Sequence, residues 1–150
     1  MMQNLRLIML LGVAAIALQS CVVQERDRFV SCGRSHRLQI VDLDVAPDPI
    51  AQRQRIDQWR VRLRADASGE CQTVLRIQES VGKQLVAEDR VFRLRPGMND
   101  IVMDPAGGYG FSQAQHCYQV IADIEGTRQT IDAARDFCAR QRADGRWSMR

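Results

Sequence analysis

Cysteine is the residue type whose number and spacing in this chain allow definite chemistry. The chain contains five cysteines, namely Cys21, Cys32, Cys71, Cys117 and Cys138. No two of them form the close C-x-x-C pair of a zinc or redox site, so their spacing predicts no metal site and no cofactor. The two histidines, His36 and His116, also lie outside any recognisable nucleophile or metal spacing. With no G-x-S-x-G motif present either, we expect a protein that is not an enzyme.

The first cysteine follows a short apolar segment at the N-terminus. Arg6 precedes an almost entirely apolar run from Leu7 to Leu18, and polar and small residues then lead into Cys21. This order is typical of a secretory signal. The run is too short to cross a hydrocarbon core of ~30 Å as a helix, which takes about 20 residues. The sequence therefore predicts a signal peptide over residues 1–20.

The stretch Leu18-Gln19-Ser20-Cys21 resembles the lipobox of bacterial lipoproteins, although that family usually has a smaller residue in place of Gln19. The resemblance implies that Cys21 becomes the first mature residue and carries lipid, including palmitate-type acyl chains. Several acyl chains together make membrane attachment effectively permanent. Val22 stands where the family's signal for retention at the inner membrane is an Asp, so the resemblance implies the periplasmic face of the outer membrane. The alternative is a plain cleaved signal peptide with an incidental Cys21.

The remaining chain shows the alternation of polar and apolar residues that is typical of strands. The clearest strand lies at 58–67, where Trp59, Val61, Leu63 and Ala65 alternate with arginines. Seven strands are expected, over 37–45, 58–67, 71–79, 84–95, 98–103, 116–124 and 127–137. The pattern predicts an all-β, seven-stranded immunoglobulin-like β-sandwich over 37–138. Residues 21–36 would then be a lipidated N-terminus and tether, and residues 139–150 a basic C-terminal tail.

Two segments also resemble a bacterial family of such sandwiches, the cell-adhesion-related CARDB-type domains. They are the corner Arg95-Pro96-Gly97-Met98-Asn99-Asp100-Ile101 and the strand Cys117-Tyr118-Gln119-Val120-Ile121-Ala122-Asp123. The family usually continues with an acidic, asparagine-rich segment, from which residues 131–136 depart. The resemblance implies the sandwich fold but no particular function, because such sandwiches serve many roles.

The four cysteines that follow Cys21 indicate two disulfides, because an even number of them would lie in an oxidising compartment. In the expected strand order, the first and third strands begin at one end of the sandwich. The sixth strand begins, and the seventh ends, at the other. This arrangement favours Cys32–Cys71 and Cys117–Cys138 over the two alternative pairings.

Arginines form the most distinctive expected surface. Arg60, Arg62 and Arg64 share one face of a strand. Arg93 and Arg95 point outward from another strand. We expect these two strands in the same sheet, with a third strand between them. Such a face could hold polyanions or the acidic patch of a partner protein. The alternative is an ordinary solvated face, neutralised by nearby acids, for which the candidates are Asp57, Asp66, Glu88 and Asp89. The chain as a whole is nearly balanced, with a formal net charge of +3, which argues against nucleic acid as a partner.

A glycine-rich loop with two aromatic residues, Tyr109 and Phe111, is the second candidate binding feature. Loop aromatics often act as binding anchors. The alternative is that both rings fold back and cap the sandwich.

These features together predict a lipid-anchored, non-catalytic binding or assembly module of the cell envelope. It would bind an envelope protein through an exposed sheet edge or through the loop around Tyr109. A periplasmic inhibitor or immunity protein, directed against an envelope hydrolase or toxin, is the alternative function.

Overall fold

The structure is a computed structural model that describes residues 30–66, 69–111, 117–127, 129–133 and 136–149. In these ranges the chain is all-β, with antiparallel strands and two 3-10 turns, η1 (Arg34–His36) and η2 (Ala106–Gly108). Neither turn approaches the length and apolarity that a membrane-crossing helix needs. Residues 1–29, which contain the expected signal peptide and Cys21, lie outside the described residues.

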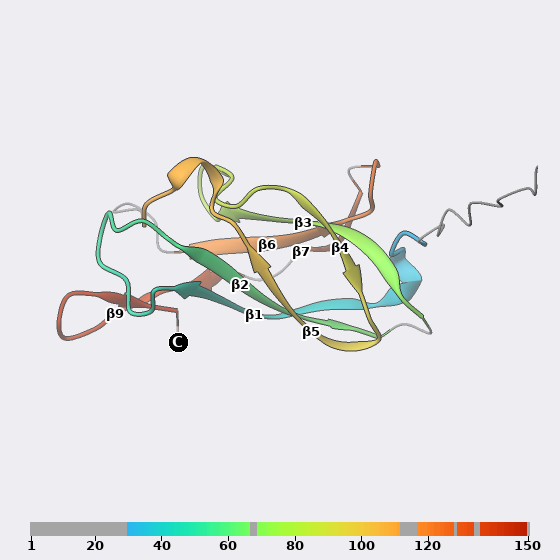
Figure 1. Cartoon of the computed structure of the whole chain (residues 1–150), viewed down its shortest axis with the longest axis horizontal. Coiled ribbons are helices and arrows are strands. Elements are labelled where there is room, and N and C mark those ends of the chain that lie inside the picture. Colours follow the sequence, from blue (N-terminus) through green and yellow to red (C-terminus); the bar gives the residue numbers. More distant parts are fainter. Residues whose placement is uncertain (1–29, 67–68, 112–116, 128, 134–135, 150) are drawn as a thin grey trace, which may run out of the picture.

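Two antiparallel sheets form the body of the molecule (Figure 1). The first has the order β1-β2-β5 and consists of β1 (Leu38–Ala46), β2 (Gln58–Ala65) and β5 (Gly97–Met103). The second has the order β4-β3-β6-β7 and consists of β3 (Cys71–Glu79), β4 (Arg90–Leu94), β6 (Cys117–Asp123) and β7 (Thr130–Ala133), with β8 (Phe137–Cys138) also paired to β6. A separate hairpin joins β9 (Arg140–Gln141) to β10 (Trp147–Ser148).

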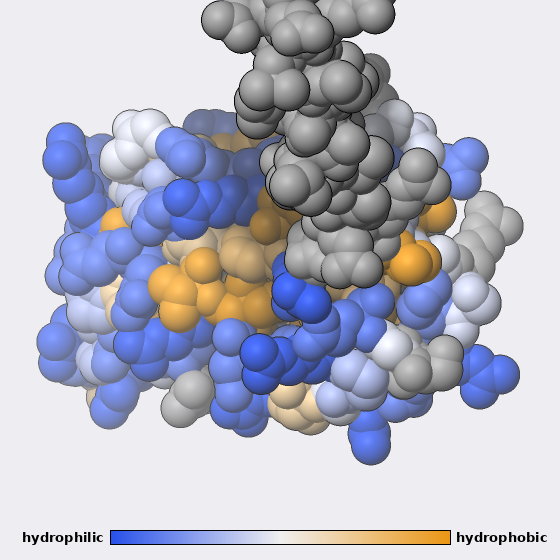
Figure 2. All heavy atoms as spheres, turned by 45° about the vertical axis from the view of Figure 1, so that its right-hand side comes forward, coloured by the Kyte–Doolittle hydropathy of each residue, from blue (hydrophilic) through white to orange (hydrophobic). Residues whose placement is uncertain are grey.

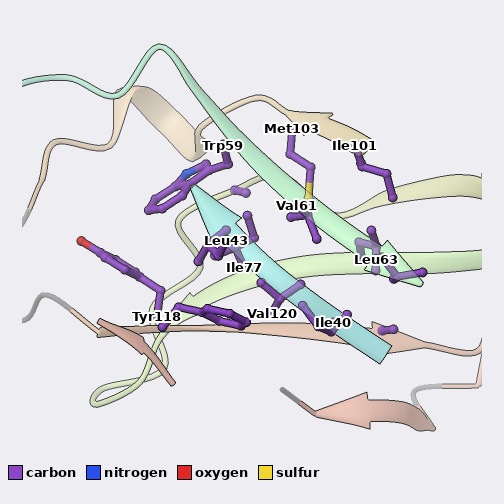
Figure 3. Packing of buried hydrophobic residues seen from close by; sticks show 14 of the residues in the cluster. Ile40, Leu43, Trp59, Val61, Leu63, Ile77, Ile101, Met103, Tyr118 and Val120 are labelled. Carbon is purple, nitrogen blue, oxygen red and sulfur yellow. The ribbon is translucent and has the colours of Figure 1, made fainter. Parts of the chain in front are cut away.

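The core lies between the two sheets, and period-two alternation explains how β2 contributes to it. The side chains of Trp59, Val61, Leu63 and Ala65 are buried, whereas the arginines between them are exposed, as the sequence predicts. Trp59 is fully buried, and its indole Nε1 donates a hydrogen bond to the Val86 carbonyl at 3.0 Å. Figure 3 shows the residues of the first sheet facing Ile77, Tyr118 and Val120 of the second sheet.

Disulfides join Cys32 to Cys71 and Cys117 to Cys138, which are the pairings that the sequence favours. The first ties the segment before β1 to the start of β3, and both of its cysteines are buried. The second joins residues that lie directly opposite each other on β6 and β8. Each bond closes a loop of the chain and so reduces the entropy of the unfolded state.

The prediction that the arginine strands share a sheet is wrong. Arg60, Arg62 and Arg64 lie on β2 in the first sheet, whereas Arg93 lies on β4 in the second and Arg95 follows it in the corner before β5. The reason is that the chain changes sheets between β2 and β3, so β4, which pairs with β3, lies in the second sheet. Alternation shows which residues share a face of a strand, but it does not show which strands are neighbours.

Both ends of the described chain pack onto the sandwich. Ile50 and Trp147 exchange two backbone hydrogen bonds, each of 2.8 Å, so the segment expected as a basic tail folds as a hairpin beside the β1–β2 connection. Trp147 lies 6.1 Å from Phe111 between ring centroids. At the other end, the Cys32 backbone donates to the Gln72 carbonyl at 2.7 Å, so the last part of the expected tether belongs to the fold.

The two sheets meet along the β1 and β7 side. A register shift between Ile40 and Asp42 distorts β1, and there the Ile40 N–H donates to the Asp132 carboxylate of β7 at 3.1 Å. This bond occupies a backbone group at the outer edge of β1. The other side of the sandwich is bounded by β4 and β5, the outermost strands of their sheets.

Replacing Asp132 tests how much this closure contributes. We expect Asp132→Ala to lower the free energy of unfolding by about 1–2 kcal/mol, because the partly buried Ile40 N–H loses its acceptor. Asp132→Asn keeps a carbonyl oxygen and should cost clearly less. Urea titration followed by tryptophan fluorescence measures both values, and equal losses in the two variants would show that the hydrogen bond is not the cause.

Candidate functional site

The aromatic residues of the glycine-rich loop pack against the core, although Gly107 and Gly108 are exposed. Phe111 is only 1% exposed, and its backbone pairs with the β1–β2 connection through Phe111 N to Gln54 O at 2.9 Å and Arg53 N to Phe111 O at 3.0 Å. The Tyr109 carbonyl accepts from Ile56 N at 3.3 Å. The expectation that Phe111 anchors a partner is therefore wrong, because its ring is already packed in the core.

Tyr109 is half-buried, and its hydroxyl donates to the buried Glu79 carboxylate at 2.6 Å. The Tyr118 hydroxyl lies 3.4 Å from the Tyr109 hydroxyl, and the two rings meet edge to face at 6.4 Å. Burial, followed by the hydrogen bond to Glu79, raises the pKa of Tyr109 well above its ordinary value. Tyr109 thus ties the loop to the end of β3, and the alternative in which the rings cap the sandwich describes both aromatics better.

Tyr109→Phe tests this connection at two pH values. At neutral pH we expect a loss of about 1–3 kcal/mol in unfolding free energy, because the buried Glu79 carboxylate loses a donor. Above the ordinary tyrosine pKa of 10.0, unfolded Tyr109 releases its proton while folded Tyr109 keeps it, so stability falls as pH rises. The variant lacks this loss at position 109.

The stability difference between the native protein and Tyr109→Phe should therefore shrink between about pH 9 and about pH 11. Chemical unfolding at several pH values across that window measures it. A difference that stays constant or widens with pH would contradict the role assigned to Tyr109.

The outer face of the three-stranded sheet places the β2 arginines beside acids. Arg62 lies between Asp42 of β1 and Asp100 of β5 in the strand register, and its Nε lies 3.0 Å from Asp100 Oδ1. The hydrogen bond that Arg62 Nε donates to this carboxylate is the largest cause of the raised pKa of the Arg62 guanidinium. On the neighbouring strand β1, Asp44 lies directly opposite Arg60 in the register. A shallow depression of about 220 Å³ runs over these residues.

The other three arginines of the expected cationic surface, Arg64, Arg93 and Arg95, also form ion pairs with acids. Arg64 Nε lies 3.4 Å from Asp66, and Glu70 forms ion pairs with both Arg93 and Arg95. The arginines therefore do not form one continuous cationic surface, and the neutralised alternative describes them better. Of the acids expected nearby, Asp66 is a partner. Glu70, Asp100, Asp42 and Asp44 are not among the acids expected from the sequence, although the alternation of Asp42 and Asp44 matches that of the arginines.

β5 is an outermost strand of this sheet and carries exposed side chains. β5 pairs with β2 from Ala65–Gly97 to Trp59–Met103 without a register shift, and among the described residues no further strand pairs with its other side. Met98 and Val102 on its outer face are 52% and 51% exposed. Asp100, whose side chain is 76% exposed, lies between them. Figure 2 shows that one side of the body carries an apolar area bordered by hydrophilic residues.

The histidines and acids of the described residues form no group of three that could hold a metal ion. His36 Nδ1 accepts a hydrogen bond from the Gly33 backbone at 2.8 Å, within the η1 turn. His116 lies outside the described residues. In comparison with known proteins, no family model matches the sequence, and no curated protein matches it significantly. Function must therefore be argued from the surfaces themselves.

Proposed function

We propose that the chain is a lipoprotein of the outer membrane whose β-domain acts as a non-catalytic binding or assembly module at the periplasmic face. The observation that carries the proposal is the combination of the lipobox-like stretch ending at Cys21 with two disulfides in the domain that follows. Disulfides persist in oxidising compartments, which include the periplasm. The lipobox-like stretch and the two disulfides therefore both support a location in the periplasm.

We further propose that the domain is an immunoglobulin-like sandwich. In support, the order β1-β2-β5 in one sheet and β4-β3-β6-β7 in the other uses seven consecutive strands. The chain changes sheets three times, between β2 and β3, between β4 and β5, and between β5 and β6. A fully buried tryptophan, Trp59, lies between the sheets. Sandwiches of this class commonly present loops and strand edges to partners, which fits a binding module.

Chain length limits how the domain sits at a membrane. Nine peptide units separate Cys21 from Val30, and a fully extended chain spans at most ~3.6 Å per residue, or ~32 Å in total. Because Cys32 is bonded to Cys71, the end of the domain at which β3 starts would stay close to the lipid.

Cys21→Ser tests the anchor. We expect the native chain, expressed in a Gram-negative host, to incorporate radiolabelled palmitate and to sediment with the outer membrane. The variant should incorporate none and should appear in the soluble periplasmic fraction. Cys32→Ser serves as the matched control, because it removes a cysteine without touching the lipobox. Equal labelling of the native protein and Cys21→Ser would contradict lipidation at this site.

The binding role is tested by chemical crosslinking in intact cells that make the protein, followed by purification of the anchored full chain under denaturing conditions. We expect a small set of envelope proteins to be recovered reproducibly. Recovery of lipids and abundant porins alone would contradict a protein-binding module. A lytic enzyme held in a nanomolar complex would instead favour the inhibitor function.

A further inference from the structure

We propose that the outer edge of β5 is the docking site of this module, and that it accepts an extended segment of a partner protein as an added strand. The segment would carry an apolar, a basic and an apolar residue at alternate positions. This inference rests on the proposed function and names the surface through which that function would operate.

The first argument is that no further strand pairs with the described β5 edge, although the Gly97 carbonyl at its start accepts a hydrogen bond from the Asn99 side chain at 3.1 Å. Within the described residues, no backbone hydrogen bond joins Gly97–Met103 to any segment other than β2. Backbone pairing on that side begins only after the strand, where the Asp104 carbonyl accepts from Glu88 N at 3.2 Å. An unpaired row of N–H and C=O groups on a regular strand is a template for a further strand.

The second argument is that the other edges are less suitable. β1 is distorted by its register shift, and Asp132 already occupies the N–H of Ile40. β7 (Thr130–Ala133) is short and contains a shift against β6. β4 has five residues, and two of them, Arg90 and Arg93, form ion pairs with Asp104 and Glu70. β5 has seven residues and carries no arginine or lysine that would repel a second chain.

The third argument concerns what would lie opposite each side chain. Val102, Asp100 and Met98 follow one another along the outer face of β5, as the register with Arg60, Arg62 and Arg64 of β2 shows. Apolar residues on an added strand would cover Met98 and Val102, which are half-exposed. A basic residue would lie opposite Asp100, which binds Arg62 through Oδ1 and remains largely exposed.

Charge also argues against a second copy of this chain as the occupant. Antiparallel pairing of β5 with itself about its central residue would place Asp100 directly opposite the Asp100 of the other copy. Like charges directly opposite each other on neighbouring strands are destabilising. A heterologous segment with a cation at that position avoids this repulsion, so we assign the edge to a different protein.

A defined peptide tests the site on the purified full-length protein. The acetylated and amidated peptide TVTKTVT places valine, lysine and valine on one face, and its pattern is the same in both strand directions. In ¹H–¹⁵N correlation spectra we expect the amide signals of Gly97–Met103 to shift and saturate. The control peptide TVTETVT, with glutamate in place of lysine, should bind at least tenfold more weakly. Equal binding of the two peptides, or shifts centred on β4, would overturn the inference.

Two matched variants locate the interaction. Val102→Lys places a charge on the β5 edge, and Val91→Lys makes the same change on β4 at a valine of similar exposure, 48% against 51%. We expect the first variant to weaken binding of TVTKTVT at least tenfold and the second to leave it unchanged. Native-like melting temperatures in both variants would exclude misfolding as the cause. Equal effects of the two changes would count against β5.

Site-specific photo-crosslinking in cells separates failure of the site from failure of the function. A benzoylphenylalanine side chain is placed at position 102 or at position 91 of the anchored protein. Crosslinked partners from position 102 but not from position 91 support the docking site. Partners from position 91 alone overturn it while the binding function stands. If neither position yields a partner and chemical crosslinking recovers none, the proposed function itself fails.

Discussion

The packing of Trp59 against Tyr118 is the contact on which the rest of this structure depends. The two rings meet edge to face at 4.9 Å and join β2 of the first sheet to β6 of the second. Trp59 also holds the segment before β4 through its bond to Val86, and it lies 6.4 Å from Tyr109 in the glycine-rich loop. Because the tryptophan faces inward, alternation turns the neighbouring arginines outward. The same contact thus determines the core and the charge pattern of the outer face.

Much of this arrangement could be predicted from the sequence, because it depends on local periodicity. The inward face of β2 and both disulfide pairings follow from alternation and strand order. The sheet membership of Arg93 does not, because it depends on the chain changing sheets between β2 and β3, before β4 pairs with β3. The Arg95–Gly97 corner before β5 is similar. Asn99 accepts a hydrogen bond from the Arg95 N–H and donates one to the Arg95 carbonyl, each at 2.9 Å, but nothing in that bonding shows that the chain returns to the first sheet.

The candidate sites were harder to predict, since their character depends on contacts between distant segments. An aromatic residue in a glycine-rich loop has the same local sequence whether it binds a partner or packs inward. Phe111 packs inward because residues 53–56 form hydrogen bonds with its loop. The arginines of β2 likewise resemble a cationic surface until the register sets Asp42 and Asp100 on either side of Arg62. In both cases, contacts between segments far apart in the sequence decide whether a side chain is available to a partner, and the local sequence does not show these contacts.

The two long sides of the sandwich differ in whether the outer backbone N–H and C=O groups of their edge strands are available for pairing. On the β1 side, a shifted register and the Asp132 carboxylate interrupt the edge, both of which discourage pairing with another chain. On the β5 side the strand is regular, and Met98 and Val102 are left half-exposed around a carboxylate. A protein that only had to avoid aggregation would benefit from blocking both sides. The asymmetry is explained if the β5 edge is kept open for a partner, with Asp100 limiting which strands can add there.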